Sequence, residues 1–149
     1  MADVTPTMPD QLVNHLNPGA PALLLTAGSD GYPSSAYTWA VALDEKCVRF
    51  AVGAEGTAMV NLNNSGLAGI HIIGPNNLAY LVKGSAKQIK DKIAAISGGE
   101  MSLWEMQVMG ARDQSYPGVT PKPFTYEWPE DQKAAMEQME QSVFAEMKG

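Results

Sequence analysis

The chain has 149 residues, of which 45% are hydrophobic and only 17% are charged, so it can bury a core and is not a disordered protein. Its net charge of −6 argues against a basic nucleic-acid-binding surface, and no apolar run approaches the ~20 residues of a membrane span. The single Cys47 cannot form an internal disulfide, so we expect a cytoplasmic protein. The low charge content also suggests that a second subunit covers part of the surface.

A helix is predicted over Thr7–Leu16, with Thr7 as its cap. The apolar run Ala22–Thr26 then predicts a buried strand, and Ser34–Leu43 alternates as a second strand. One face of this second strand is bulky and the other is almost bare; the bulky face carries Tyr37, Trp39, Val41 and Leu43, and the bare face Ala36, Thr38, Ala40 and Ala42. A bare face lets another backbone, a helix or a flat ligand approach closely.

The middle of the chain predicts an antiparallel meander followed by a short helix. Cys47–Val52 alternates as the third strand of the meander. A glycine-containing turn then leads into a helix predicted over Thr57–Leu62. Two more strands, Leu67–Ile73 and Leu78–Lys87, are joined by a strong hairpin sequence, Gly74-Pro75-Asn76-Asn77.

The last third of the chain predicts one or two strands and a terminal helix. Gly84 indicates a β-bulge within the strand Leu78–Lys87, and apolar residues at every second position favour a strand over Ser102–Ala111. Phe124–Glu127 is interpreted as a short strand, and an amphipathic helix is predicted from Pro129 to about residue 147. Six or seven strands with short turns predict a mainly β, small antiparallel barrel, and we expect a single domain over residues 1–149.

The connection within Phe50–Leu62 is the first candidate binding feature. A strand runs into a glycine-containing turn and a helix start, where backbone N–H groups would converge on one anion, namely those of Gly56, Thr57 and Ala58. The hydroxyl of Thr57 would add a donor. Against this stand Glu55 in the same turn and the lack of any Lys or Arg over residues 50–82. A plain strand-to-helix connection with Thr57 as a cap is the alternative.

Tyr37, Thr38 and Trp39 form the second candidate feature, because they would line a flat aromatic ligand beside that turn. The alternative is that Tyr37 and Trp39 are core residues. The two histidines, His15 and His71, lack metal-ligand spacing with each other and with the one cysteine, so no metal site is predicted. No Gly-x-Ser-x-Gly motif and no P-loop supports triad hydrolysis or nucleotide hydrolysis.

Taken in order, these segments resemble the flavin-binding split-barrel family that includes pyridoxamine-phosphate oxidase and small FMN-binding proteins. The similar segments spread over roughly residues 8–90 and are Ala22–Thr26, Asp30-Gly31-Tyr32-Pro33, Thr38-Trp39, Phe50-Ala51-Val52-Gly53, Asn61-Leu62 and Lys83-Gly84-Ser85-Ala86. The resemblance implies a six- to seven-stranded antiparallel split β-barrel with short flanking helices.

The resemblance also implies FMN as the cofactor and a homodimer with FMN at its interface. The isoalloxazine ring and ribityl chain would lie along Tyr37, Thr38 and Trp39, and the phosphate end would be surrounded by Val52, Gly53, Ala54, Thr57 and Ala58. Residues of the second subunit would complete each site, with Trp104 and Tyr116 as candidates.

One departure from the family concerns the phosphate. Members commonly place a Lys or Arg at the helix start, where this chain has Thr57 and Ala58. The phosphate would then depend on backbone dipoles, on Thr57 and on a more distant cation such as Arg49 or Lys87. Weaker FMN binding, a cofactor that lacks the phosphate, and no cofactor all remain open. If Thr57 holds the phosphate, Thr57→Val weakens FMN binding.

The first functional hypothesis is an FMN-dependent oxidoreductase in which the flavin carries the electrons and no side chain acts as acid or base. Its partners would be a second copy of the chain and a small redox substrate or electron donor. The alternatives are a non-enzymatic binding or storage module for FMN, haem or another flat ligand, and a cofactor-free member of the fold. Pyridoxamine phosphate as substrate is not implied, because the family's substrate-binding basic residues have no clear counterpart.

Overall fold

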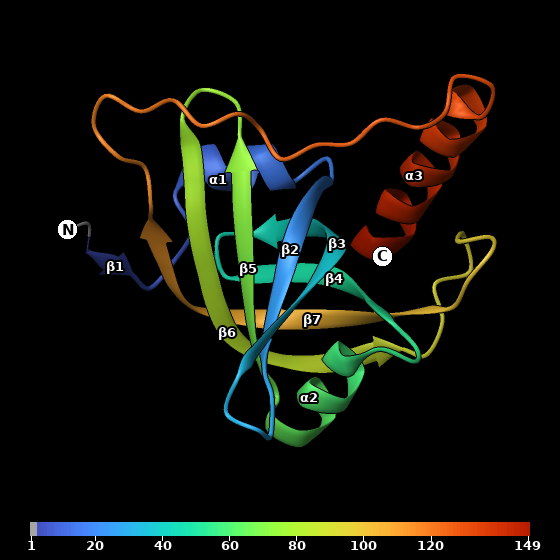
Figure 1. Cartoon of the computed structure of the whole chain (residues 1–149), viewed down its shortest axis with the longest axis horizontal. Helices are drawn as coiled ribbons and strands as arrows, with labels where there is room; N and C mark the ends of the chain where they lie inside the picture. Colours follow the sequence, from blue (N-terminus) through green and yellow to red (C-terminus); the bar gives the residue numbers. More distant parts are fainter. Residues whose placement is uncertain (1–2) are drawn as a thin grey trace.

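The computed structural model describes residues 3–149, which form seven strands and three helices (Figure 1). In chain order the elements are β1 (Val4–Thr5), α1 (Asp10–Leu16), β2 (Ala20–Ala27), β3 (Pro33–Asp44), β4 (Cys47–Gly53), α2 (Thr57–Ser65), β5 (Leu67–Gly74), β6 (Leu78–Lys90), β7 (Met101–Asp113) and α3 (Lys133–Lys148). Within these residues, no helix combines the length and the apolar character that a membrane crossing requires.

Strands β2 to β7 form a closed antiparallel barrel. The sheet order is β1-β7-β4-β3-β2-β5-β6, and an additional pairing of β6 with β7 closes it. The two-residue β1 only extends the edge of β7. The predicted meander is present, because β2 pairs with β3 and β3 pairs with β4. The mainly β split barrel expected from the sequence is therefore confirmed.

The barrel interior is filled from the bare face of β3 and from the helices at its two ends. Ala40 and Ala42 of β3 point into the main core and are fully buried. Leu12 and Leu16 of α1 enter the same core, and Leu62 of α2 does so too. Figure 1 shows α1 and α2 at opposite ends of the barrel. The small side chains of β3 leave room for these larger ones.

A second, smaller core lies on the outer face of β3, β4 and β7. Val41 and Leu103 pack there against Val143 and Met147 of α3 and against Ile93. The three strands are thus covered on both faces in this region, which explains why they carry adjacent buried residues instead of a strict alternation. Figure 1 shows α3 lying beside the barrel at the end of a long connection from β7.

The first helix is shorter than predicted. It begins at Asp10 with Pro9 as the capping position, so Thr7 is not the cap. The reason is that buried Met8 donates its amide to the carbonyl of Glu45 at 2.9 Å, which holds the chain extended until Pro9.

The C-terminal segment differs from the prediction in two places. Phe124–Glu127 is not a strand; Phe124 donates one backbone hydrogen bond to Ile73 (2.8 Å), and no ladder continues from it in the described chain. The predicted helix starts later, at Lys133, because Pro129 to Gln132 form a separate turn in which the Gln132 amide donates to the Pro129 carbonyl.

The remaining turn predictions are confirmed. The β5–β6 hairpin turns at Asn76 and Asn77, with φ values of 59° and 63°. The register between β6 and β7 shifts at Gly84, which is the expected bulge. Residues 91–100 contain turns and no helix between β6 and β7.

Candidate functional site

A cavity of about 450 Å³ opens between β3 and the segment Phe124–Tyr126; we call it the aromatic pocket. Four aromatic rings contribute to its lining, which consists of Pro21, Tyr37, Thr38, Trp39, Met101, Phe124, Thr125 and Tyr126. Its volume falls within the roughly 300–1,000 Å³ of small-molecule sites. A predominantly apolar, ring-lined cavity of this size suits a flat, largely apolar ligand.

The bulky face of β3 supplies the wall of the aromatic pocket. Val41 on this face is covered by α3, Trp39 is half-buried with its ring edge-on to Phe144 (6.2 Å between centroids), and Tyr37 lies beyond the helix. The Tyr37 side chain is 78% exposed and stacks on Phe124 at 5.6 Å. The interpretation of Tyr37 as a core residue is therefore wrong.

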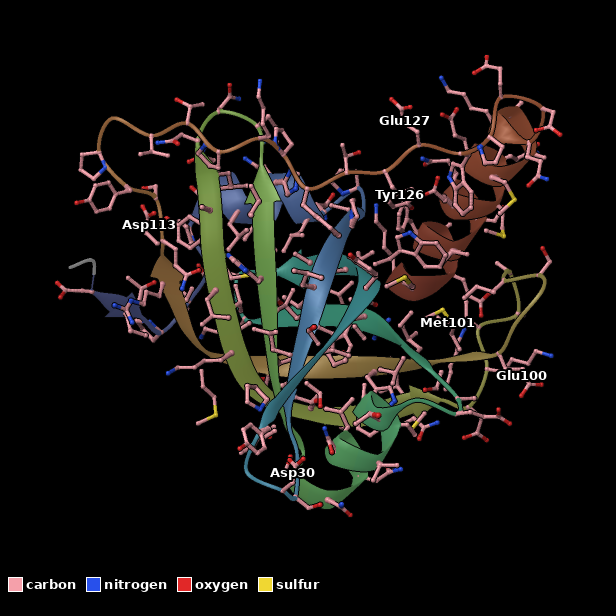
Figure 2. All side chains as sticks on the ribbon, viewed as in Figure 1. Asp30, Glu100, Met101, Asp113, Tyr126 and Glu127 are labelled. Carbon is pink, nitrogen blue, oxygen red and sulfur yellow. The ribbon has the colours of Figure 1, made fainter. Side chains whose placement is uncertain are left out.

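The opposite wall is the segment Phe124–Trp128, which we call the strap. The Trp39 indole N–H donates to the Tyr126 hydroxyl at 2.6 Å, and that hydroxyl donates to Glu140 of α3. The Trp128 indole N–H donates to the other oxygen of Glu140 at 2.6 Å. Figure 2 shows Tyr126 between the barrel and α3. This wall was not predicted from the sequence, although the aromatic cluster in residues 124–128 is a visible signal.

Burial, reinforced by the hydrogen bond to Glu140, raises the pKa of the Tyr126 hydroxyl well above its ordinary value. The phenol is therefore protonated at neutral pH and serves as a hydrogen-bond donor. It offers the pocket no general base.

Thr38 fixes the floor of the aromatic pocket. The β3–β4 ladder ends where Ala40 pairs with Phe50. Beyond that point the Thr38 hydroxyl replaces the backbone hydrogen bonds between the two strands. It donates to the Ala51 carbonyl at 2.6 Å and accepts from the Ala51 amide at 3.2 Å. This buried hydroxyl is therefore already engaged with β4, and it holds the two strands together where their backbones separate.

A second hollow lies at the strand-to-helix turn; we call it the turn cavity. It is lined by Gly53, Ala54, Glu55, Gly56 and Glu100. It shares no lining residue with the aromatic pocket, but Gly53 of its lining pairs in the β4–β7 ladder with Met101, which lines that pocket. Figure 2 shows Glu100 and Met101 next to each other at the start of β7.

The predicted phosphate-binding residues divide into two groups. Val52 is buried in the main core and offers a ligand only its backbone, whereas Ala58 is half-buried and packs against that core. Gly53 and Ala54 line the turn cavity, and Thr57 is exposed at the first position of α2, where Gly56 occupies the capping position. The predicted strand, turn and helix start are thus brought together beside the predicted aromatic residues.

The two candidates for completing a partner's site differ in exposure. Trp104 is 3% exposed, and its indole N–H donates to Ser102, which in turn donates to the carbonyl of Val52. Buried within its own barrel, Trp104 cannot contact a ligand held by another subunit, so this prediction is wrong. Tyr116 is exposed and remains a prediction.

The residues present fit one end of FMN better than the other. The rings of the aromatic pocket match a flat heterocycle. At the turn cavity, by contrast, Glu55 and Glu100 contribute two carboxylates and no basic side chain belongs to the described lining. The donor chemistry there does not fit a phosphate dianion.

No family model and no curated protein matches the sequence. Solved structures do resemble it. A candidate pyridoxamine 5'-phosphate oxidase from Lactobacillus delbrueckii superposes with a TM-score of 0.58 at 17% identity, covering 72% of this chain and 94% of that chain. Group A Streptococcus HupZ gives a TM-score of 0.56 at 16% identity, covering 75% and 94%. An F420 reductase gives 0.55 at 16% identity, covering 64% and 90%.

These neighbours confirm the resemblance stated from the sequence at the level of the fold. The chain has the split-barrel fold of the pyridoxamine 5'-phosphate oxidase-like proteins.

Proposed function

We propose that this protein binds a flavin, with the isoalloxazine ring in the aromatic pocket, and acts as an oxidoreductase. The observation that carries the proposal is the ring-lined cavity on β3, adjoining the turn before α2. It lies in a fold that candidate pyridoxamine 5'-phosphate oxidases and an F420 reductase also have. FMN is the flavin that the sequence resemblance implies.

The chain's own residues would position the ring and keep water from it. Tyr37 and Trp39 on β3 would provide the aromatic wall, and the strap would cover the opposite side. The bond from Trp39 to Tyr126 orients both rings. A bound flavin supplies hydride and electron transfer, so the protein's part is binding, orientation and electrostatics.

A homodimer is part of this proposal. The low charge content and the 78% exposure of Tyr37 support a second copy that covers the open side of the pocket. Tyr116 is the remaining candidate for a contribution from the second copy. Sedimentation at micromolar concentration should give twice the 15.9 kDa chain mass, whereas a monomer under flavin-saturating conditions would contradict this part.

Titration with riboflavin and FMN, followed by flavin fluorescence and absorption, tests the binding proposal. We expect saturable binding at one flavin per subunit. Tyr37→Ala should weaken it about tenfold through loss of ring contact. Tyr32→Ala is the matched control, since this tyrosine is 73% exposed in the β2–β3 turn outside the pocket lining and should have no effect. If neither flavin binds saturably, the proposed function is wrong.

The oxidoreductase part needs a separate measurement. Steady-state reduction of the bound flavin by NADH or NADPH, with oxygen as the final acceptor, should exceed that of the same concentration of free flavin. A bound flavin that no nicotinamide donor reduces would indicate a binding or storage module instead.

A further inference from the structure

We infer that the ligand's tail carries no phosphate, so that the site prefers a flavin with a neutral hydroxylated tail, as in riboflavin, over FMN. This inference rests on the proposed function, because it assumes that the ring lies in the aromatic pocket. With the ring there, the tail reaches the turn cavity, where Glu55 and Glu100 line the surface.

Backbone pairing brings Glu55 and Glu100 to the same turn. The Ala54 amide donates to the Glu100 carbonyl at 3.1 Å, which ties the start of β7 to the turn that contains Glu55. The adjacent Gly53–Met101 pair continues the same β4–β7 ladder. Strand pairing therefore places Glu100 beside the turn that contains Glu55.

The nearby cations do not offset these charges. Lys92 lies 3.6 Å from Glu100, but the two side chains are 57% and 68% exposed, so this ion pair is weak and solvent also screens the charge of Glu100. Arg49, one of the two more distant cations considered for the phosphate, is engaged elsewhere: its Nε lies 3.2 Å from Glu105 and its Nη1 donates to the Met147 carbonyl at 2.9 Å. Lys87, the other, faces Glu105 in the β6–β7 ladder.

The same carboxylates suit a polyol. A ribityl chain presents several O–H donors, and ionised carboxylates only accept hydrogen bonds. Bonds from hydroxyl donors to Glu55 or Glu100 would be charge-assisted and would orient the tail. A phosphate dianion in the same place would meet like charge, and the protein's net charge of −6 adds to that repulsion.

Parallel titrations with riboflavin and FMN test the inference. At low ionic strength riboflavin should bind about tenfold more tightly, and the difference should shrink in about 1 M salt as the repulsion is screened. Glu100→Gln and Glu55→Gln should each strengthen FMN binding several-fold without strengthening riboflavin binding. Glu45→Gln is the control, because it makes the same change in net charge at an exposed position of the β3–β4 turn.

The outcomes separate the two proposals. FMN binding as tightly as riboflavin, or Thr57→Val weakening FMN while the glutamine variants leave it unchanged, would overturn this inference and leave flavin binding intact. Failure of both flavins to bind would overturn the proposed function and this inference with it.

Discussion

Trp39 and Tyr126 are joined by a 2.6 Å hydrogen bond from the indole N–H to the phenolic oxygen, although 87 positions separate them in the chain. The contact fastens the strap to β3, and Glu140 of α3 accepts a bond from the same hydroxyl. Three segments therefore hold one another in place. The wall of the aromatic pocket depends on the docking of α3 as well as on the barrel.

Glu140→Leu should release the strap. The substitution removes the acceptor for both Tyr126 and Trp128, and hydrogen bonds to charged groups are worth about 1.5–3 kcal/mol when buried, less at this partly exposed site. We expect chymotrypsin to cleave the strap about tenfold faster and flavin binding to weaken. Glu137→Leu is the control, because Glu137 is exposed on the same helix and has no side-chain hydrogen bond in the described chain. If chymotrypsin cleaves both variants at the same rate, Glu140 does not hold the strap in place.

Glu146 should make the docking of α3 sensitive to acid. Burial alone would raise its pKa, but the amides of Ala94 and Ala95, at 2.9 and 2.8 Å, and the ammonium of Lys90 lower the pKa below the ordinary 4.5. Since the folded-state pKa is lowered, the stabilisation is present above the unfolded value and is lost as pH falls through the folded value. The free energy of unfolding should therefore drop below about pH 4.5, and Glu146→Gln should reduce that drop. If the free energy of unfolding of Glu146→Gln depends on pH as that of the unmodified protein does, the contact contributes no stability.

Alternation along β3 predicted which side chains share a face, but not which face looks inward. A period of two is the same from either side. The choice depends on the partners: α1 and α2 send Leu16 and Leu62 into the barrel, so the small face of β3 turns inward. The bulky face points outward, where α3 packs on Val41 and Trp39 but does not cover Tyr37. Only the three-dimensional packing decides this.

The turns, the bulge and Glu55 beside the predicted phosphate site were predictable because they are local features of the sequence, whereas the strap and Glu100 were not. Gly84 and the Asn76-Asn77 pair determine backbone conformation locally. Tyr126 and Glu100 reach the site through tertiary contacts, with Trp39 in one case and with Ala54 in the other. No local pattern in the sequence records such contacts.

Gly84→Ala should disrupt the closure of the barrel. A Cβ at this position would lie 2.0 Å from the carbonyl oxygen of Gln107 on β7, and backbone cannot move aside cheaply. We expect a loss of more than about 2 kcal/mol in the free energy of unfolding, measured in urea. Gly99→Ala is the control, because a Cβ there has nothing within 4 Å, and it should change stability by less than about 0.5 kcal/mol. Similar stability of the two variants would contradict the tight approach at the bulge.

Cys47 should react slowly with thiol reagents. Burial, together with the hydrogen bond that the thiol donates to Glu105 at 3.3 Å, raises the pKa of the thiol from 9.0 to about 12. A rise of about three pKa units corresponds to about a thousandfold less thiolate, which is the reactive form. Because the chain has one cysteine, alkylation by iodoacetamide at about pH 8 reports this thiol alone.

We therefore expect alkylation of the folded protein to be at least about a hundredfold slower than in urea. Glu105→Gln should accelerate it, since the carboxylate disfavours the thiolate both as hydrogen-bond acceptor and as neighbouring charge. Burial raises the pKa of Glu105, but the hydrogen bonds from Cys47 and Arg49 and the charge of Arg49 lower it below its ordinary value. Glu105 therefore stays ionised, and the ratio of the variant's rate to the wild-type rate should be the same from about pH 6 to about pH 8. Equal rates in the folded protein and in urea would show that the thiol is neither shielded nor bonded to Glu105.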